Sequence, residues 1–374
     1  MMDRLFPVGL ESHLSFYLIV YMLTLVVHVF LMTYVLAGSL WLAWATMFPG
    51  RDVLPLTKQP LAMILRDWMP FALSGAITAG VAPLLFVQIL YRQQFYTANL
   101  LLGWRWMMVI PVLVIAFYLL YVIKSKAVSR WSFPVRCGLA ASVAASFLFV
   151  AFCWTTNHLL SLDQAVWPEM YRSRQAIDAM VPLCFRLLTW VAGSFPTMSI
   201  LASWQLWGMR RCDANREPSV SAVDSLAMYD REDRRLAKVS VTGLLVAVIS
   251  GVCYAITLKS NVASQLTGNA GFPWLLIGIA GVAFQAIGWS FQLRKPCFCH
   301  RWLTMITVAS LCTLMATASL REIVRLSQAN VIQVTESTRA AAEVGGFSVF
   351  MIFTIINTAL ICWCLRMVMN RHRI

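Results

Sequence analysis

Long apolar segments recur along the chain and are separated by short segments rich in Lys and Arg. The first of them, Leu14 to Phe48, contains no Asp, Glu, Lys or Arg. About 20 helical residues cross the hydrocarbon core of a bilayer, so this segment predicts a membrane-spanning helix. Helical steps back from its single histidine, His28, reach a narrow polar stripe that should face protein instead of lipid, made of Thr24, Tyr21 and Tyr17.

The same criterion predicts nine spans, and therefore an all-α, polytopic transmembrane bundle that forms one integral membrane domain over residues 1–374. The predicted ranges are Leu14–Phe48, Trp68–Tyr91, Leu101–Ile123, Gly138–Ser161, Val181–Met209, Val239–Leu258, Phe272–Leu293, Trp302–Leu320 and Gly345–Met369. An odd number of spans places the termini on opposite faces. The loops on the face of the C-terminus carry more than twice as many Lys and Arg residues as the other loops. The positive-inside rule then predicts an outside N-terminus and a cytoplasmic C-terminus.

Composition supports the membrane class, because 60% of the residues are hydrophobic and 12% are charged, against about a quarter charged in soluble domains. The net charge of +14 is spread over short loops and not gathered on one basic domain, so we expect no nucleic-acid partner. The longest connection, Arg210 to Lys238, has alternating charges and is expected to be a solvated helical turn or loop without chemistry.

The ten cysteines show no disulfide framework, and free thiols are expected. One cluster, Cys297-Phe298-Cys299-His300, superficially resembles a covalent haem attachment site. That motif needs two residues between its cysteines, and this chain has one. We therefore expect no c-type haem, and read the segment as a solvated loop.

Ionisable residues inside spans are costly, so each is a functional candidate. His28 is either an axial ligand of haem iron or a hydrogen-bonded structural histidine. His158 is either a second ligand, a proton donor to a quinone head group, or a satisfied interfacial histidine. Arg105 and Arg186 either pair with haem carboxylates or a quinone carbonyl, or extend to the outer interface. Arg366, near the cytoplasmic end of the last span, is expected only to extend to the interface.

The predicted topology brings several of these candidates to one end of the bundle. Arg105, His158 and Arg186 all fall near the outer boundary, and His13 joins them at the start of the first span. These four residues could form one cluster.

The sequence lacks the residues that several common membrane and enzyme functions need. No Asp or Glu lies inside the predicted spans, which argues against a proton-pumping carboxylate relay and against cation-coupled transport. Walker, HExxH and nucleophile-elbow motifs are also absent from the sequence. Ordinary hydrolase or nucleotidase chemistry therefore has no support, and whether the chain is an enzyme stays open.

The order of several short motifs resembles subunit I of the cytochrome bd quinol oxidases and related membrane-integral cytochromes, over about Ser12 to Arg211. The matching features are His28 followed by Leu36-Ala37-Gly38, Phe71-Ala72-Leu73 followed by Ala76-Ile77-Thr78-Ala79-Gly80 and Gln88, and Phe152-Cys153-Trp154-Thr155-Thr156-Asn157. The resemblance implies an inner-membrane subunit that transfers electrons between the quinone pool and a partner, either another membrane subunit or a c-type cytochrome. It also implies that His28 ligates a haem b.

The chain departs from that family at two places. Leu188 stands where the family has a later haem-ligating histidine, and the span Leu101–Ile123 lacks the family's glutamates. The resemblance therefore implies at most one haem and no oxygen reduction by this chain alone. The alternative is a haem-free structural or assembly subunit that keeps the bundle without the chemistry.

Overall fold

The computed structural model describes residues 6–49, 59–173, 180–214, 221–294 and 300–343, with single positions between 348 and 366. The regular elements in these ranges are all helical, which confirms the all-α prediction for this part of the chain. The α-helices are α1 Ser12–Met47, α2 Pro60–Leu90, α3 Arg92–Leu102, α4 Trp104–Met107, α5 Val109–Lys124, α6 Phe133–Leu162, α7 Trp167–Ser173, α8 Met180–Ala214, α9 Ser221–Ile256, α10 Ser260–Thr267, α11 Phe272–Arg294, α12 His300–Gln328 and α13 Val331–Glu343.

Seven helical segments in the described ranges are long and apolar enough to cross a membrane: α1, α2, α4 with α5, α6, α9 from Ala227, α11 and α12. Large apolar side chains lie exposed on their outer faces, for example Ile110 at 72% and Ile256 at 78%. Such exposure suits lipid contact, so these helices indicate a multi-pass membrane protein. Helix α8 is also long, at 35 residues, but Arg186 and many Ser, Thr and Trp residues lower its hydropathy.

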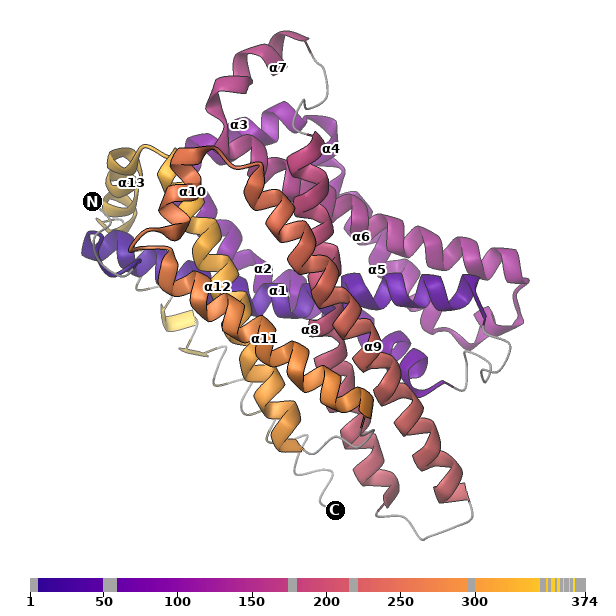
Figure 1. Ribbon diagram of the computed structural model, residues 1–374. Helices are drawn as coiled ribbons and strands as arrows, with labels where there is room; N and C mark the ends of the chain where they lie inside the picture. Colours follow the sequence, from indigo (N-terminus) through magenta and orange to yellow (C-terminus); the bar gives the residue numbers. More distant parts are fainter. Residues whose placement is uncertain are drawn as a thin grey trace.

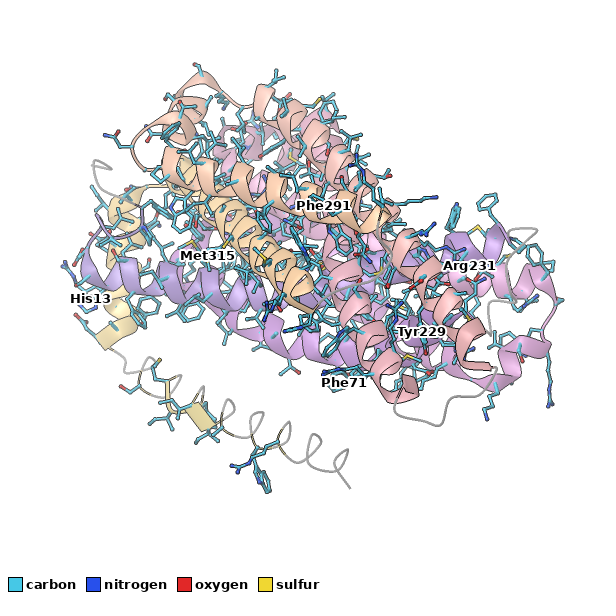
Figure 2. All side chains as sticks on the ribbon, turned by 60° about the horizontal axis from the view of Figure 1, so that its bottom comes forward. His13, Phe71, Tyr229, Arg231, Phe291 and Met315 are labelled. Atoms are coloured by element: carbon cyan, nitrogen blue, oxygen red, sulfur yellow. The ribbon has the colours of Figure 1, made fainter. Side chains whose placement is uncertain are left out.

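Helix α1 occupies the centre of the bundle and packs against α2, α6, α8 and α12 (Figure 1). Helices α8 and α9 form the most extensively packed pair. Two apolar cores fill opposite ends of α1. One contains Tyr17, Leu90 and Ile323, and the other contains Trp41, Met69 and Leu236. His13 marks the first end and Tyr229 the second in Figure 2. For brevity, the end of the bundle that holds His13 is called the N-terminal end.

Interhelical hydrogen bonds tie α8 to its neighbours. Tyr34 on α1 donates to Gln205 at 2.9 Å, and Trp204 donates to Thr307 on α12 at 3.0 Å. Close approach of α8 and α9 requires a glycine, since a Cβ on Gly243 would lie 2.8 Å from the carbonyl oxygen of Ala192. Polar contacts and small residues of this kind replace the hydrophobic effect as the source of helix association in a bilayer.

The helices differ from the predicted spans in several places. Gly103, with φ of 56°, separates α3 from α4, so the third span begins at Trp104 and a separate helix precedes it. Helix α12 continues to Gln328, beyond the predicted end at Leu320. The predicted ninth span, Gly345–Met369, lies largely outside the described residues, as do Cys297 and Cys299.

The connection Arg210–Lys238 is helical in part, but the expectation of a solvated segment is wrong for its second half. Helix α9 begins within it, and Glu232 and Asp233 are only 5% and 3% exposed. Arg210 on α8 donates to Asp233 at 3.1 Å and to Asp230 at 2.9 Å. Alternating charge therefore marks an ion-pair junction between α8 and α9, because Asp230 and Asp233 share Arg210 of α8, while Glu232 pairs with Arg235 on its own helix.

The expectation of free thiols is confirmed for the five cysteines whose side chains are described, namely Cys137, Cys153, Cys184, Cys253 and Cys312.

Candidate functional site

His28 is held between α1 and α2 through one of its ring nitrogens. Its Nδ1 lies 2.8 Å from the carbonyl oxygen of Ala76 on α2. A carbonyl can only accept, so Nδ1 carries the proton and the neutral ring presents an unprotonated Nε2. The ring lies directly on Gly80, where a Cβ would be 2.8 Å from Nδ1 and 2.9 Å from Cε1. The predicted small-residue run of α2 thus has a physical role, because it lets the imidazole approach the helix backbone.

The polar stripe before His28 faces protein, as predicted, at Tyr17 and Tyr21, which are both buried. Thr24 donates to carbonyl oxygens of its own helix, at Val20 and Tyr21. The hydroxyl of Tyr21 accepts a hydrogen bond from Arg321 on α12. The stripe therefore leads away from the His28 ring toward a buried cluster of charges at the N-terminal end of the bundle.

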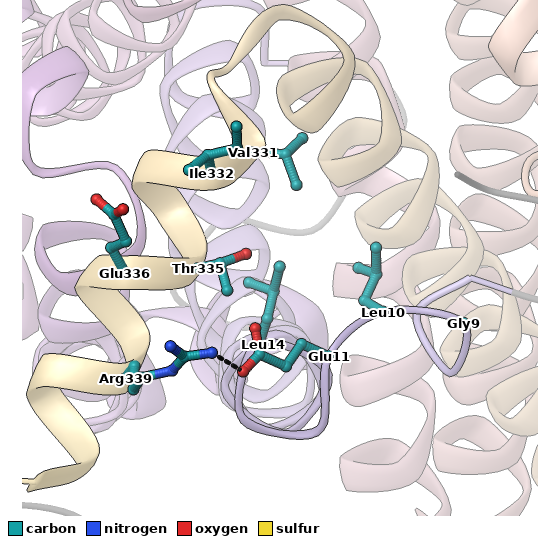
Figure 3. Close-up of a pocket in the computed structure, with 9 residues that line it drawn as sticks. All are labelled: Gly9, Leu10, Glu11, Leu14, Val331, Ile332, Thr335, Glu336 and Arg339. Carbon is teal, nitrogen blue, oxygen red and sulfur yellow. Dashed lines mark hydrogen bonds and ion pairs between the residues drawn. The ribbon is translucent and has the colours of Figure 1, made fainter.

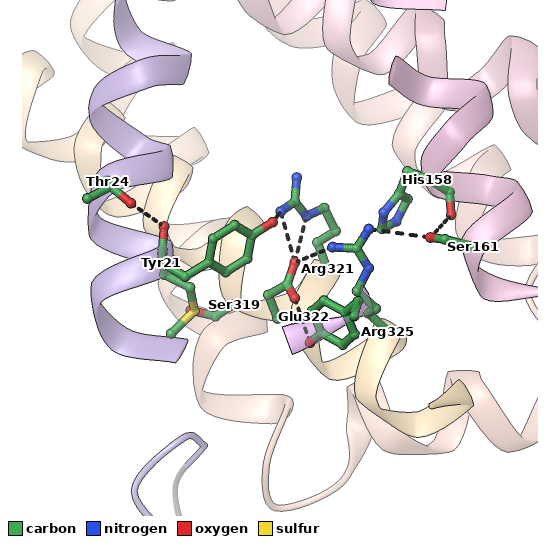
Figure 4. A network of polar contacts seen from close by, with 10 residues as sticks. Tyr21, Thr24, His158, Ser161, Ser319, Arg321, Glu322 and Arg325 are labelled. Carbon is green, nitrogen blue, oxygen red and sulfur yellow. Dashed lines mark hydrogen bonds and ion pairs between the residues drawn. The ribbon is translucent and has the colours of Figure 1, made fainter. Parts of the chain in front are cut away.

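That cluster is centred on Glu322, whose side chain is fully buried (Figure 4). One carboxylate oxygen accepts from Arg321 at 2.8 and 3.0 Å, and the other accepts from the hydroxyl of Tyr91, the residue that directly follows α2, at 2.9 Å. Arg325, one helical turn beyond Glu322, forms a longer ion pair with it at 3.8 Å and places its guanidinium 4.4 Å from the centre of the Tyr91 ring. The cluster thus joins α1, α2 and α12.

The predicted span Trp302–Leu320 has no acidic residue, but helix α12 continues beyond it and buries Glu322 in the bundle. The sequence places this residue beyond Leu320 in a run with Arg321 and Arg325 that resembles an interfacial loop. The carboxylate is tolerated inside because two guanidiniums and a phenol satisfy its oxygens.

His158 and Arg325 lie next to each other between α6 and α12 (Figure 4). Arg325 donates to the hydroxyl of Ser161 at 3.3 Å, and that hydroxyl donates to the backbone carbonyl of His158 at 2.7 Å. His158 Nε2 and Arg325 Nε are both buried without a hydrogen-bond partner. Such orphaned groups are uncommon in native interiors and call for an explanation.

The predicted outer cluster is assembled only in part. Arg186 donates to the hydroxyl of Tyr254 at 2.8 Å, and its charge acts on His158 together with the charges of Arg321 and Arg325. Arg105 instead lies over its neighbour Trp104, at 5.6 Å from the ring centre, and His13 is exposed. Of the four predicted residues, His158 and Arg186 therefore lie close enough for their charges to interact, and Arg321 and Arg325 act on the same histidine.

Leu188, where the resemblance described above expects a histidine, is 45% exposed on α8. Its side chain therefore contributes little to the interior around His28.

A separate surface pocket of about 310 Å³ lies between the start of α1 and α13 (Figure 3). Arg339 donates to Glu11 at 2.7 Å across it, and this hydrogen bond raises the pKa of the Arg339 guanidinium. Leu10, Leu14 and Ile332 form its apolar wall. The Arg339–Glu11 ion pair is exposed to solvent and shares no ionisable group with the buried cluster. It is therefore a surface contact between α1 and α13 and not part of the candidate site.

Comparison of the chain with models of known protein families and with curated proteins finds no match in either.

Proposed function

We propose that this protein is a membrane electron-transfer subunit that holds one haem b through Nε2 of His28. The observation that carries the proposal is the hydrogen bond between His28 Nδ1 and the carbonyl oxygen of Ala76. A metal-ligating histidine typically donates its second ring N–H to a carbonyl or carboxylate, which fixes the tautomer and orients the ligating nitrogen. His28 shows this arrangement, because its Nδ1 is engaged by Ala76 and Nε2 is the ring nitrogen left to ligate a metal.

Haem b bound there would supply a one-electron carrier inside the bilayer. The chain's own contribution is orientation and charge. Ala76 and Gly80 fix the imidazole, and Arg321 is close enough for its charge to act on His28. The guanidiniums of Arg321 and Arg325 replace Arg105 as the residues best placed to meet haem carboxylates, since a guanidinium fork suits such groups.

The proposal includes the wider setting that the sequence predicts. The chain spans a cell inner membrane nine times with its N-terminus outside, as favoured by the distribution of Lys and Arg. It exchanges electrons between quinone and a partner redox subunit or c-type cytochrome. The alternating directions of the helices support this topology, because the ends of α2, α6 and α12 meet the start of α1.

A reduced-minus-oxidised absorption spectrum of the protein, purified with its partners retained, tests the function. We expect a b-type haem band that His28→Ala removes and that His13→Ala, a change at an exposed histidine of the same helix, leaves unchanged. Absence of the band in the unaltered protein would refute the proposal.

The second candidate function is a haem-free structural or assembly subunit. The exposed Leu188 at the second ligand position favours it. In that case His28→Ala lowers the stability of the bundle, through loss of the contact with Ala76, without any spectral change.

A further inference from the structure

The buried cluster at the N-terminal end carries more positive than negative charge. Arg321 and Arg325 have side chains that are 15% and 5% exposed, and Glu322 is the carboxylate that pairs with both. Half-buried Arg186, whose charge acts on the same region, has a phenol as its hydrogen-bond partner and not a carboxylate. Among the described residues, the ion pairs therefore leave the charge of one buried guanidinium unbalanced, and Arg186 adds a second positive charge.

An unbalanced buried charge is costly, because the interior cannot replace the hydration that the ion loses. Folded proteins meet this cost with a counter-ion from the chain or from a ligand. The excess positive charge in this cluster lies beside two buried nitrogen atoms without a hydrogen-bond partner, His158 Nε2 and Arg325 Nε. His158 is 7% exposed, so solvent does not serve it readily.

The chemistry of these two atoms limits what can pair with both of them. The Nε of a guanidinium is always a donor, and Nε2 of a neutral histidine is a donor in one of its two tautomers. In that tautomer a partner for both atoms must accept two hydrogen bonds. Since the surrounding charge is positive, an anionic oxygen group satisfies the donors and the charge together.

We propose that His158 and Arg325, supported by Arg186, form a binding site for an anionic oxygen group, a carboxylate or a phosphate. The site does not depend on haem at His28. Its ligand has one of three sources that share this chemistry: the carboxylates of haem, the phosphate of an anionic lipid, or free phosphate.

The test begins with the full chain, prepared without haem and reconstituted in nanodiscs of phosphatidylcholine. The thermal unfolding midpoint is measured after three separate additions: sodium phosphate, phosphatidylglycerol in the nanodisc, and haem. We expect at least one addition to raise the midpoint. His158→Phe fills the same space without a donor and keeps the Arg321–Glu322 pair, and we expect it to weaken the apparent affinity about tenfold to hundredfold, as for one charge-assisted hydrogen bond. His13→Phe is the matched control and should behave as the unaltered protein.

The three additions identify the source. Haem dimethyl ester, which keeps the iron and lacks free carboxylates, refines the haem result. If haem carboxylates occupy the site, the ester binds the unaltered protein more weakly than haem, and the difference disappears in His158→Phe. A stabilisation by phosphate or lipid that persists in His28→Ala supports the site even if the protein binds no haem.

The inference is overturned if none of the additions raises the midpoint, or if they raise it equally in the unaltered protein and in His158→Phe. Arg325→Met gives a second check, because it removes the guanidinium donor and its charge. If the site takes no anion, this variant shows the same response to every addition as the unaltered protein, whatever its own stability.

Discussion

Gly80→Ala is the most specific perturbation of the proposed haem-ligand geometry. The added Cβ would lie 2.8 Å from His28 Nδ1 and 2.9 Å from Cε1, closer than any stable carbon contact, so the ring must move. Movement of the ring away from α2 breaks the 2.8 Å hydrogen bond to Ala76. The substitution therefore disturbs the tautomer and orientation of His28 without altering the histidine itself.

The magnitude follows from three effects. Overpacking a well-packed interior costs about 1–3 kcal/mol. A buried nitrogen that loses its partner costs about 1–3 kcal/mol more. Replacing glycine by alanine inside a helix returns about 1 kcal/mol. The free energy of unfolding should therefore fall by about 1–5 kcal/mol.

Unfolding by titration with sodium dodecyl sulfate in mixed micelles measures this change, and the haem absorption band of the same samples reports ligation. Gly138→Ala on α6 is the matched control, since a Cβ there meets nothing within 4 Å. It should be neutral or stabilise the protein by up to about 1 kcal/mol. If Gly80→Ala is as stable as Gly138→Ala and retains the full band, the described packing of His28 on α2 is refuted.

Four further changes test other parts of the account, each by the same unfolding assay. Glu322→Gln leaves Arg321 and Arg325 without their carboxylate and should cost about 3–5 kcal/mol; a neutral result would mean that the carboxylate does not hold the cluster. Tyr91→Phe removes the donor to Glu322 and should cost about 1–3 kcal/mol, whereas Tyr118→Phe, at a 66% exposed position, should cost nothing measurable. Gly243→Ala places a Cβ 2.8 Å from the backbone oxygen of Ala192 and should cost about 1–3 kcal/mol, while Gly208→Ala, in open space, should not; equal stability would exclude the close contact of α8 with α9. Arg339→Gln breaks an exposed ion pair, and an unchanged unfolding midpoint is expected; a large shift would mean that α13 depends on this contact.

The sequence predicts the membrane-spanning character well, because each span is a long run of apolar residues. The segment Leu14–Phe48 differs from helix α1 by two residues at its start and one at its end. Helix ends set by charged residues are predicted less well. Helix α12 extends through Arg321, Glu322 and Arg325 because these residues pair with one another and with α2, and hydropathy cannot distinguish paired charges from solvated ones.

The candidate site, too, could be predicted from the sequence only in part. His28 stands out in the sequence as the one ionisable side chain in a long apolar run, but its partner is a backbone carbonyl, which leaves no signature in the residue types. The small residues Ala76 and Gly80 were the available signal. Glu322 could have been found from its spacing, since Arg325 lies one turn away on the same helical face and Arg321 is adjacent.

Imidazole rescue of a His28→Gly variant shows whether His28 ligates the iron of a haem. We expect His28→Gly to lack the b-type haem band of the unaltered protein and added imidazole to restore it, because free imidazole can occupy the vacated space and supply the ligating nitrogen. A His28→Gly variant that keeps the full band without imidazole, or an unaltered protein without any band, would contradict ligation of haem by His28.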